Sequence, residues 1–208
     1  LMNSHFLIAK SLLNNIDNNK LFFINEKHFI YGNLKPDAVP QYVFKKHYLN
    51  ESFDTIAQKI NYLCSLTIDS LSRYFSVSKF SQELGVICHF LCDFFCVPHS
   101  ERWEFKHSMK KHMSYEKQLS IVAKNSNLSI YKGDIITNNS FKDFFDILYT
   151  EYKSKLDYEN DLFFSSYACN SVINYILDNI LKNTVSSKIQ HLFFNLITLV
   201  LNHLIVFL

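Results

Sequence analysis

Residues that break helices are scarce in this chain, and this scarcity limits the possible folds more than any other feature. Of its 208 residues, only 3 are Gly and 3 are Pro. Sandwiches and barrels need many tight turns, which depend on these residues, so such folds are disfavoured. Hydrophobic residues make up 48% and charged residues 19%, which excludes a disordered chain. We therefore predict an all-α fold, a multi-helix bundle that forms one domain over residues 1–208.

Apolar residues recur at helical spacing along most of the chain. The segment from Ser78 to Phe95 is apolar nearly all round, which is typical of the central helix of a bundle. Gly32, Pro36 and Pro40 predict a loop over residues 28–41, and a second, polar loop is expected over residues 125–134. The other helices are expected to begin near Ser4 and to cover about residues 52–74, 101–117, 140–156, 158–182 and 187–208.

The C-terminal segment, residues 189–208, has no formal charge and is about as long as a helix that spans a bilayer. His191, Asn195, Thr198 and Asn202 nevertheless form one polar stripe along it. Such a stripe favours an apolar helix docked against the bundle, with a membrane-associated helix as the alternative. No signal peptide is recognisable, which fits a cytoplasmic protein or a processed secreted form.

Charge and cysteine content limit the partners and the redox chemistry. The net charge of +2 and the absence of a Lys/Arg run give no reason to expect a stable nucleic-acid partner. Cys88, Cys92 and Cys96 follow one another every four residues on one predicted helix, so they cannot pair along that helix. Reduced core residues are the expected interpretation. A thiolate metal site is the other, although paired C-x-x-C motifs are absent.

Imidazole and carboxylate side chains recur four residues apart in two places. His89 and Asp93 lie on the most apolar helix, and their spacing puts both on one face. A buried charge is costly unless a partner such as a cation compensates it. His99 follows, and His112 and Glu116 repeat the four-residue spacing. Either pair alone has an ordinary explanation in hydrogen bonding or solvent exposure, but five such ligands within 28 residues predict a site for more than one metal ion.

This pattern resembles the zinc ligands of the bacterial zinc-dependent phospholipases C, which share a superfamily with single-strand-specific nucleases. The family also has an N-terminal His, an Asp in a loop and a further His, which His5, Asp37 and His47 match. The resemblance covers residues 5–116. Its central string is His89-x3-Asp93-x5-His99-x12-His112-x3-Glu116.

The resemblance implies two or three zinc ions. One ion would be held by Asp37, His47, His89 and Asp93, a second by His99, His112 and Glu116, and a third by His5 with Asp93 as a bridge. In the family, the third ion also takes the amine and carbonyl of an N-terminal Trp. This chain has Leu1 and Met2 and no Trp before His5.

The resemblance also implies the activity of a phospholipase C, a zinc-dependent phosphodiester hydrolase. The substrate would be a phospholipid or another phosphodiester, reached by contact with a membrane surface. Zinc lowers the pKa of bound water towards neutrality, so metal-activated water would attack the phosphodiester. Asp37 would be the general base, or only a ligand. Phe44 matches one aromatic ring of the choline-specific members, but Ala38 stands where another ring would be, so a headgroup preference does not carry over.

Two alternatives remain open at this point. A single-strand-specific nuclease or nucleotidase shares the fold and the ligand order, but in those enzymes the last His–carboxylate pair lies further along and ends in Asp. Here the gap is short and the pair ends in Glu116. A non-catalytic, membrane-associated helical protein would rest on residues 189–208 alone and leaves the ligand string unexplained. The sequence does not indicate an oligomeric state.

Overall fold

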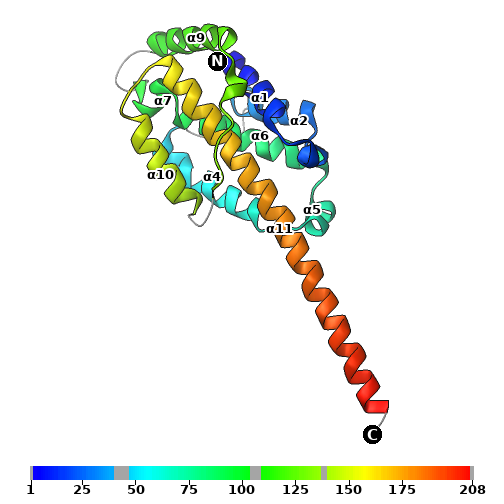
Figure 1. The fold of residues 1–208 in the computed structure, drawn as a ribbon. Helices are drawn as coiled ribbons and strands as arrows, with labels where there is room; N and C mark the ends of the chain where they lie inside the picture. The colour runs from blue at the N-terminus through cyan, green and yellow to red at the C-terminus, as the bar shows by residue number, and fades with distance from the viewer. Residues whose placement is uncertain (1, 40–46, 104–108, 137–139, 207–208) are drawn as a thin grey trace.

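Every element in the described part of the chain is a helix, which confirms the predicted all-α fold. The computed structural model describes residues 2–39, 47–103, 109–136 and 140–206, and within these ranges the side chains from Asn3 to Ile197. The elements are α1 Met2–Asn15, a 3-10 turn η1 Asn18–Phe23, α2 Glu26–Ala38, α4 Leu49–Cys64, α5 Ile68–Tyr74, α6 Val77–Phe94, α7 Val97–Ser100, α9 Met109–Asn125, a 3-10 turn η2 Leu128–Ile130, α10 Phe141–Tyr152 and α11 Tyr158–Val206 (Figure 1).

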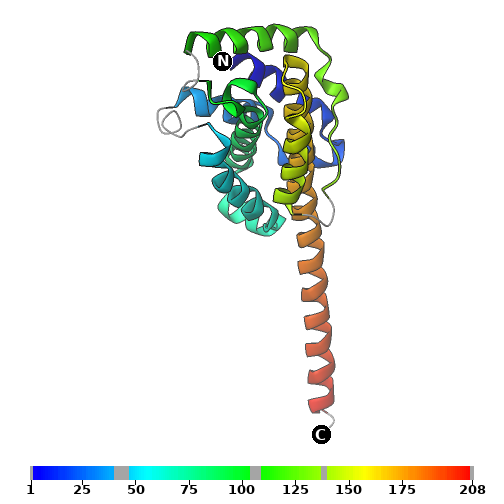
Figure 2. The same cartoon turned by 90° about the vertical axis from the view of Figure 1, so that its left-hand side faces the viewer.

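Helix α6 is the centre of the bundle. It packs against α1, α2, α4 and α11, which surround it in Figures 1 and 2. All its residues from Leu84 to Phe94 are buried, because a helix that is apolar nearly all round has no face to turn to water. Ser76 caps its start, where the side chain accepts a hydrogen bond from the backbone N–H of Lys79. A polar side chain on the second half of α6 is therefore held in the protein interior.

Helix α2 occupies residues for which the sequence predicted a loop, so that prediction is wrong over the described residues 28–38. Gly32 and Gly85 mark the point where α2 crosses α6. A Cβ atom on Gly32 would lie 2.3 Å from the carbonyl oxygen of Gln82, and one on Gly85 would lie 2.3 Å from that of Phe29. The two glycines therefore allow direct backbone contact between the helices. Here glycine serves close packing and not a turn.

Proline is tolerated in α2 because of its position. Pro36 lies in the last turn, where its missing N–H removes a single helical hydrogen bond. Val39 then ends the helix, with its N–H donating to the carbonyl of Lys35 at 3.0 Å. Pro40, the third residue on which the loop prediction rested, is outside the described residues.

The expected helix over residues 52–74 is divided in two. Thr67 begins α5 as its N-cap: its side chain accepts a hydrogen bond from the N–H of Ser70, and the Ser70 hydroxyl accepts from the N–H of Thr67. This reciprocal capping box stabilises a new helix start. At the other end of the chain, the two helices expected at 158–182 and 187–208 are one continuous helix, α11, of 49 residues.

Helix α11 begins inside the bundle and ends outside it. Near residue 184 it is tied to the bundle by Thr184, whose hydroxyl accepts from the N–H of Ile68, and by Asn183, whose amide donates to the carbonyls of Cys64 and Leu66. Side chains 185–197 are all exposed, and both views show this end of the helix extending away from the other helices (Figures 1 and 2). The described side chains of this segment are exposed, and its docking or association with a membrane stays a prediction. Within the described ranges, no helix combines the length and apolar character needed to cross a membrane.

Candidate metal centre

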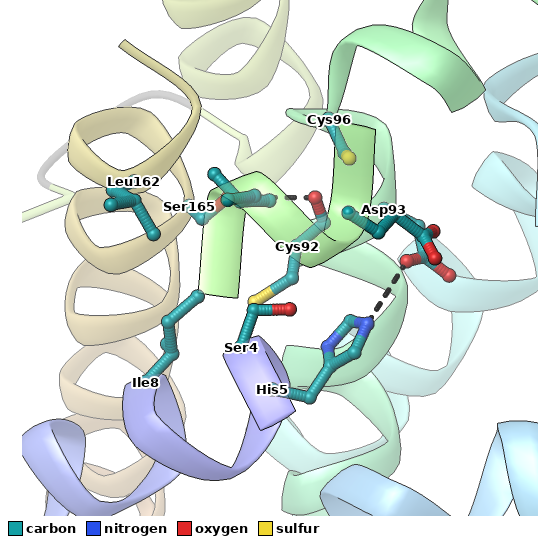
Figure 3. Close-up of a pocket in the computed structure, with 10 residues that line it drawn as sticks. Ser4, His5, Ile8, Cys92, Asp93, Cys96, Leu162 and Ser165 are labelled. Atoms are coloured by element: carbon teal, nitrogen blue, oxygen red, sulfur yellow. Dashed lines mark hydrogen bonds and ion pairs between the residues drawn. The ribbon is translucent and has the colours of Figure 1, made fainter. Parts of the chain in front are cut away.

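Asp93 lies at the centre of a cluster of imidazoles. It is only 2% exposed, near the C-terminal end of α6. Its Oδ2 lies 2.6 Å from Nδ1 of His47 and 3.1 Å from Nε2 of His89. Its Oδ1 lies 3.3 Å from Nε2 of His5 and 3.7 Å from Nε2 of His99. Figure 3 shows His5 on α1 directed towards Asp93 on α6. Four imidazoles from separate parts of the chain therefore surround one buried carboxylate.

His89 is held in one orientation by the crossing of α2 and α6. Its Nδ1 lies 2.8 Å from the carbonyl oxygen of Asn33, which only accepts hydrogen bonds, so Nδ1 carries the hydrogen. The other nitrogen, Nε2, then faces Asp93 and also lies 3.7 Å from Oδ1 of Asp37, a residue of α2 and not of a loop. Backbone carbonyls orient metal-binding histidines in this way in many metal sites. We call His5, Asp37, His47, His89 and Asp93 the Asp93 group.

A second carboxylate lies on α9. His112, Glu116, Leu119 and Ala123 form the buried stripe of this helix, although most of its other residues are exposed. Oε1 of Glu116 lies 2.7 Å from Nε2 of His112 and 3.2 Å from Nε2 of His99. We call these three residues, His99, His112 and Glu116, the Glu116 group. His99 lies close to both Glu116 and Asp93, so the structure brings all eight residues predicted as ligands into one continuous cluster.

The pKa values of the two buried carboxyl groups depend on the imidazoles around them. Burial alone would raise both pKa values. For Asp93, electrostatic interaction with the imidazoles of His89 and His99 and a hydrogen bond from His47 together outweigh burial and hold the pKa well below its usual range. For Glu116, hydrogen bonds from His112 and His99 lower the pKa to about 2. Both groups are therefore ionised at neutral pH, as carboxylates that bind metal must be.

The imidazoles around Asp93 differ in the balance between burial and the neighbouring carboxylate. Burial lowers the pKa of His89 below its ordinary value in spite of the nearby Asp93, so the ring is neutral, the form that binds a metal ion. Burial acts in the same direction on His5 and His47, but their hydrogen bonds to Asp93 outweigh it and raise both pKa values. In the protein alone, protons therefore stabilise the buried carboxylate. A cation bound at the same place would also stabilise the carboxylate, and it would bind the imidazole nitrogens as further ligands.

The donor atoms fit zinc. Three sets of possible ligand atoms lie within 4.8 Å of one another: His5, Asp37 and His89; His47, His89 and Asp93; and Cys96, His99 and Glu116. Imidazole nitrogen, carboxylate oxygen and thiolate sulfur are the donors that zinc takes in proteins. Oε2 of Glu116 and Nδ1 of His5 are buried without a hydrogen-bond partner in the part of the chain that the structure describes. Unpaired buried acceptors are costly, which a bound cation would relieve.

Asp161, at the start of α11, supports the Glu116 group and was not predicted from the sequence. It is 1% exposed and accepts hydrogen bonds from the backbone N–H of Val97 at 3.0 Å and from the hydroxyls of Tyr115 at 3.0 Å and Tyr152 at 2.9 Å. Val97 lies two residues before His99, and Tyr115 directly precedes the carboxylate of α9. Burial raises the pKa of Asp161 to about 7. The one sequence signal was a carboxylate at the start of a largely apolar helix.

Comparison with known families agrees with this geometry. A family model described as zinc dependent phospholipase C matches residues 4–159, which is more than half of the chain. The chain belongs to this family. The matched segment contains every residue of the Asp93 and Glu116 groups. The resemblance found in the sequence is therefore confirmed, and with it membership of a family of zinc-dependent phospholipase C hydrolases. No curated protein and no solved structure gave a significant match.

Proposed function

We propose that this protein is a zinc-dependent phosphodiesterase that hydrolyses the headgroup phosphodiester of a phospholipid. The observation that carries the proposal is the arrangement of four imidazoles around the buried, ionised Asp93, with a second ionised carboxylate, Glu116, joined to it through His99. Membership of the zinc-dependent phospholipase C family supports both the metal and the class of substrate.

The two groups divide the proposed metal ions between them. The Asp93 group would hold one ion, or two with Asp93 as the bridge to His5, and the Glu116 group would hold another. When bound, zinc supplies Lewis acidity towards the phosphoryl oxygens and lowers the pKa of water. The protein supplies the arrangement of ligands. Asn33 fixes the ring of His89, and Asp161 anchors the segments that carry the Glu116 group.

Asp37 is the proposed general base. Its side chain is 22% exposed, whereas those of Asp93 and Glu116 are 3% and 7% exposed. A general base has to reach both water and substrate, so the most accessible of the three carboxylates suits the role. The two deeper carboxylates are enclosed by imidazoles and suit ligation. If Asp37 acts only as a ligand, the Asp37→Asn variant will lose metal together with activity.

The test is hydrolysis by the purified full chain loaded with zinc. We expect release of a phosphorylated headgroup from phospholipid vesicles, loss of this activity with a chelator and its recovery with added zinc. Vesicles of phosphatidylcholine, phosphatidylethanolamine and phosphatidylglycerol give the headgroup preference. Single-stranded DNA and RNA are included, because cleavage of nucleic acid without cleavage of phospholipid would overturn the proposal.

Variants connect the activity to the cluster. His89→Ala is expected to abolish turnover and leave the helical circular-dichroism signal largely intact, because the ring is a ligand and not a capping residue. His191→Ala is the matched control, since this histidine is exposed on the outer part of α11. Unchanged turnover in the His89→Ala protein would refute the proposed ligand assignment.

A further inference from the structure

Cys96 lies between the two groups and belongs to neither. It connects α6 to α7 with an extended backbone, as the N-cap of α7. The residue is 6% exposed and its thiol is free. The backbone carbonyl of Cys96 accepts hydrogen bonds from the N–H groups of His99 at 3.0 Å and Ser100 at 2.9 Å. Cys96 and His99 are therefore held in one tight turn, and the position of one determines the position of the other.

The sulfur of Cys96 is close to two members of the Glu116 group. One ligand atom each from Cys96, His99 and Glu116 lie within 4.8 Å of one another. Ligands of a tetrahedral zinc ion are roughly 3.5 Å apart, given bond lengths of about 2.0 to 2.3 Å. A movement of about 1 Å thus brings the three atoms to coordinating distance. His112 already contacts Glu116 from one turn earlier on α9, which provides a fourth donor.

A second observation points to a cation at this place. Cys96 and Glu116 line one small cavity together with His5, Cys92 and Asp93. Figure 3 labels Cys96, His5, Cys92 and Asp93 among the residues around this cavity. Oε1 of Glu116 takes the contacts from His99 and His112, whereas Oε2 is buried and has no hydrogen-bond partner within the described residues. Glu116 is 5% exposed, so this oxygen is not hydrated from bulk solvent. A cation in the cavity would give it a partner.

We propose that the Cys96 thiolate is a ligand of the metal ion held by the Glu116 group, which then consists of Cys96, His99, His112 and Glu116 and takes a thiophilic divalent cation such as zinc, cadmium or cobalt. This inference rests on the proposed zinc centre. On binding, the S–H bond breaks, the sulfur forms a bond to the cation with its electron pair, and one proton is released to solvent. No oxidant or reductant takes part.

The proposal gives the two groups different tasks. Four protein donors complete a tetrahedral set, as in metal sites that stabilise structure and keep no open position. Substrate and water would then be left to the Asp93 group, beside Asp37. A soft thiolate also favours zinc or cadmium over magnesium, calcium or manganese, so the Glu116 group would be the more selective of the two.

Cobalt substitution tests the proposal, because a cobalt–thiolate bond gives a sulfur-to-metal charge-transfer band in the near ultraviolet. The full chain is freed of metal and titrated with cobalt(II). We expect the band in the wild-type protein and its loss in Cys96→Ala. We also expect the affinity for one zinc ion to fall at least about tenfold in competition with a chelator. Cys88→Ala is the matched control, because Cys88 is also a buried cysteine, on α6, but is in none of the sets of possible ligand atoms.

Each outcome decides the question. A band that survives in Cys96→Ala and disappears in Cys92→Ala overturns the proposal, as does a wild-type protein that binds cobalt without the band. The second result would leave the phosphodiesterase proposal intact if zinc-dependent hydrolysis is still observed. If Cys96→Ala does not fold, Cys96→Asp replaces it: a band lost with cobalt still bound at full stoichiometry supports the thiolate, and an unchanged band overturns it.

Discussion

The Asp93 group and the Glu116 group are assembled in different ways. The Asp93 group takes residues from α1, α2, α6 and the segment before α4, so it exists only where these elements are packed together. The Glu116 group takes its residues from α7 and α9, which are close in sequence. The Asp93 half of the cluster therefore depends on the packing of the whole bundle, whereas the Glu116 half depends mainly on a local arrangement of the chain.

The two groups also have different supports. The α2–α6 crossing is a direct backbone contact at Gly32 and Gly85, which leaves little room for movement. The Glu116 group is tied to α11 by the hydrogen bonds that Asp161 accepts from Val97 and Tyr115. Damage to packing should therefore affect the Asp93 group first, and damage to Asp161 should affect the Glu116 group first.

The largest effect is expected from Asp93→Asn, because this carboxylate contacts imidazoles of both groups. Activity should fall at least about a hundredfold, and more than one zinc ion per chain should be lost. Zinc content and turnover on phospholipid vesicles are the measurements. Asp146→Asn, at an exposed position of α10, is the control. Full zinc content in the Asp93→Asn protein would contradict the assignment of Asp93 as a shared ligand.

Gly85→Ala should weaken metal binding at the Asp93 group and leave the Glu116 group unaffected. The added Cβ would lie 2.3 Å from the carbonyl oxygen of Phe29 and push α2 away from α6. We expect a loss of about 1 to 3 kcal/mol in the free energy of unfolding and weaker metal binding at the Asp93 group, with the cobalt–sulfur band unchanged. Val86→Ala, which removes bulk from the same helix, should lower stability and leave metal binding intact. Equal losses at both groups would show that they are not independent.

Asp161→Asn should act on the Glu116 group alone. The variant weakens hydrogen bonds to Val97, Tyr115 and Tyr152, which costs about 1 to 3 kcal/mol of stability. The affinity for one metal ion should fall about tenfold or more, with the other unaffected. Chelator competition measures both. Asp178→Asn, on the exposed side of α11, is the control and should change neither affinity. A selective loss of metal affinity at the Asp93 group in Asp161→Asn would refute the positioning role of Asp161.

The raised pKa of Asp161 predicts that the free energy of unfolding of the metal-free protein depends on pH. Burial raises the pKa of Asp161 to about 7, whereas an Asp in an unfolded chain titrates near 3.9. Between about pH 4 and pH 7, the folded state therefore holds a proton that the unfolded state has lost, and the free energy of unfolding falls as the pH rises. Denaturant titrations across this pH window should show a smaller fall in the free energy of unfolding for Asp161→Asn than for the wild-type protein. An identical slope would contradict the raised pKa.

The smallest effect is expected from removing residues 187–208. Asn183 and Thr184 hydrogen-bond to the bundle, whereas the side chains from 185 to 197 are exposed. The zinc content and the free energy of unfolding of the truncated chain should match those of the full chain to within about 0.5 kcal/mol. A large loss of zinc would show that this segment supports one of the groups.

Local geometry explains why part of the site could be predicted from the sequence. His89 with Asp93, and His112 with Glu116, are four residues apart on helices, and this spacing alone puts each pair on one face. The scarcity of Gly and Pro likewise predicted the all-α fold. His5, Asp37 and His47 were predicted from a family resemblance only, because no local rule brings residues so distant in sequence together.

The remaining features depend on neighbours that a linear pattern does not contain. Gly32 predicts a turn when it is considered alone, but packed against α6 it allows a close helix crossing. Cys96 looks like a core residue on an apolar helix until the turn into α7 places its sulfur beside His99 and Glu116. Asp161 gains its role only from the groups that hydrogen-bond to it across the bundle.

The sequence by itself predicted the all-α fold and the two His–carboxylate pairs whose donor atoms suit zinc, because these follow from composition, from spacing along one helix and from donor chemistry. Only the tertiary structure decided that α2 is a helix, that α11 leaves the bundle after Thr184 and that a thiol lies beside the Glu116 group. Each of these depends on contacts between segments far apart in the chain, and packing determines such contacts.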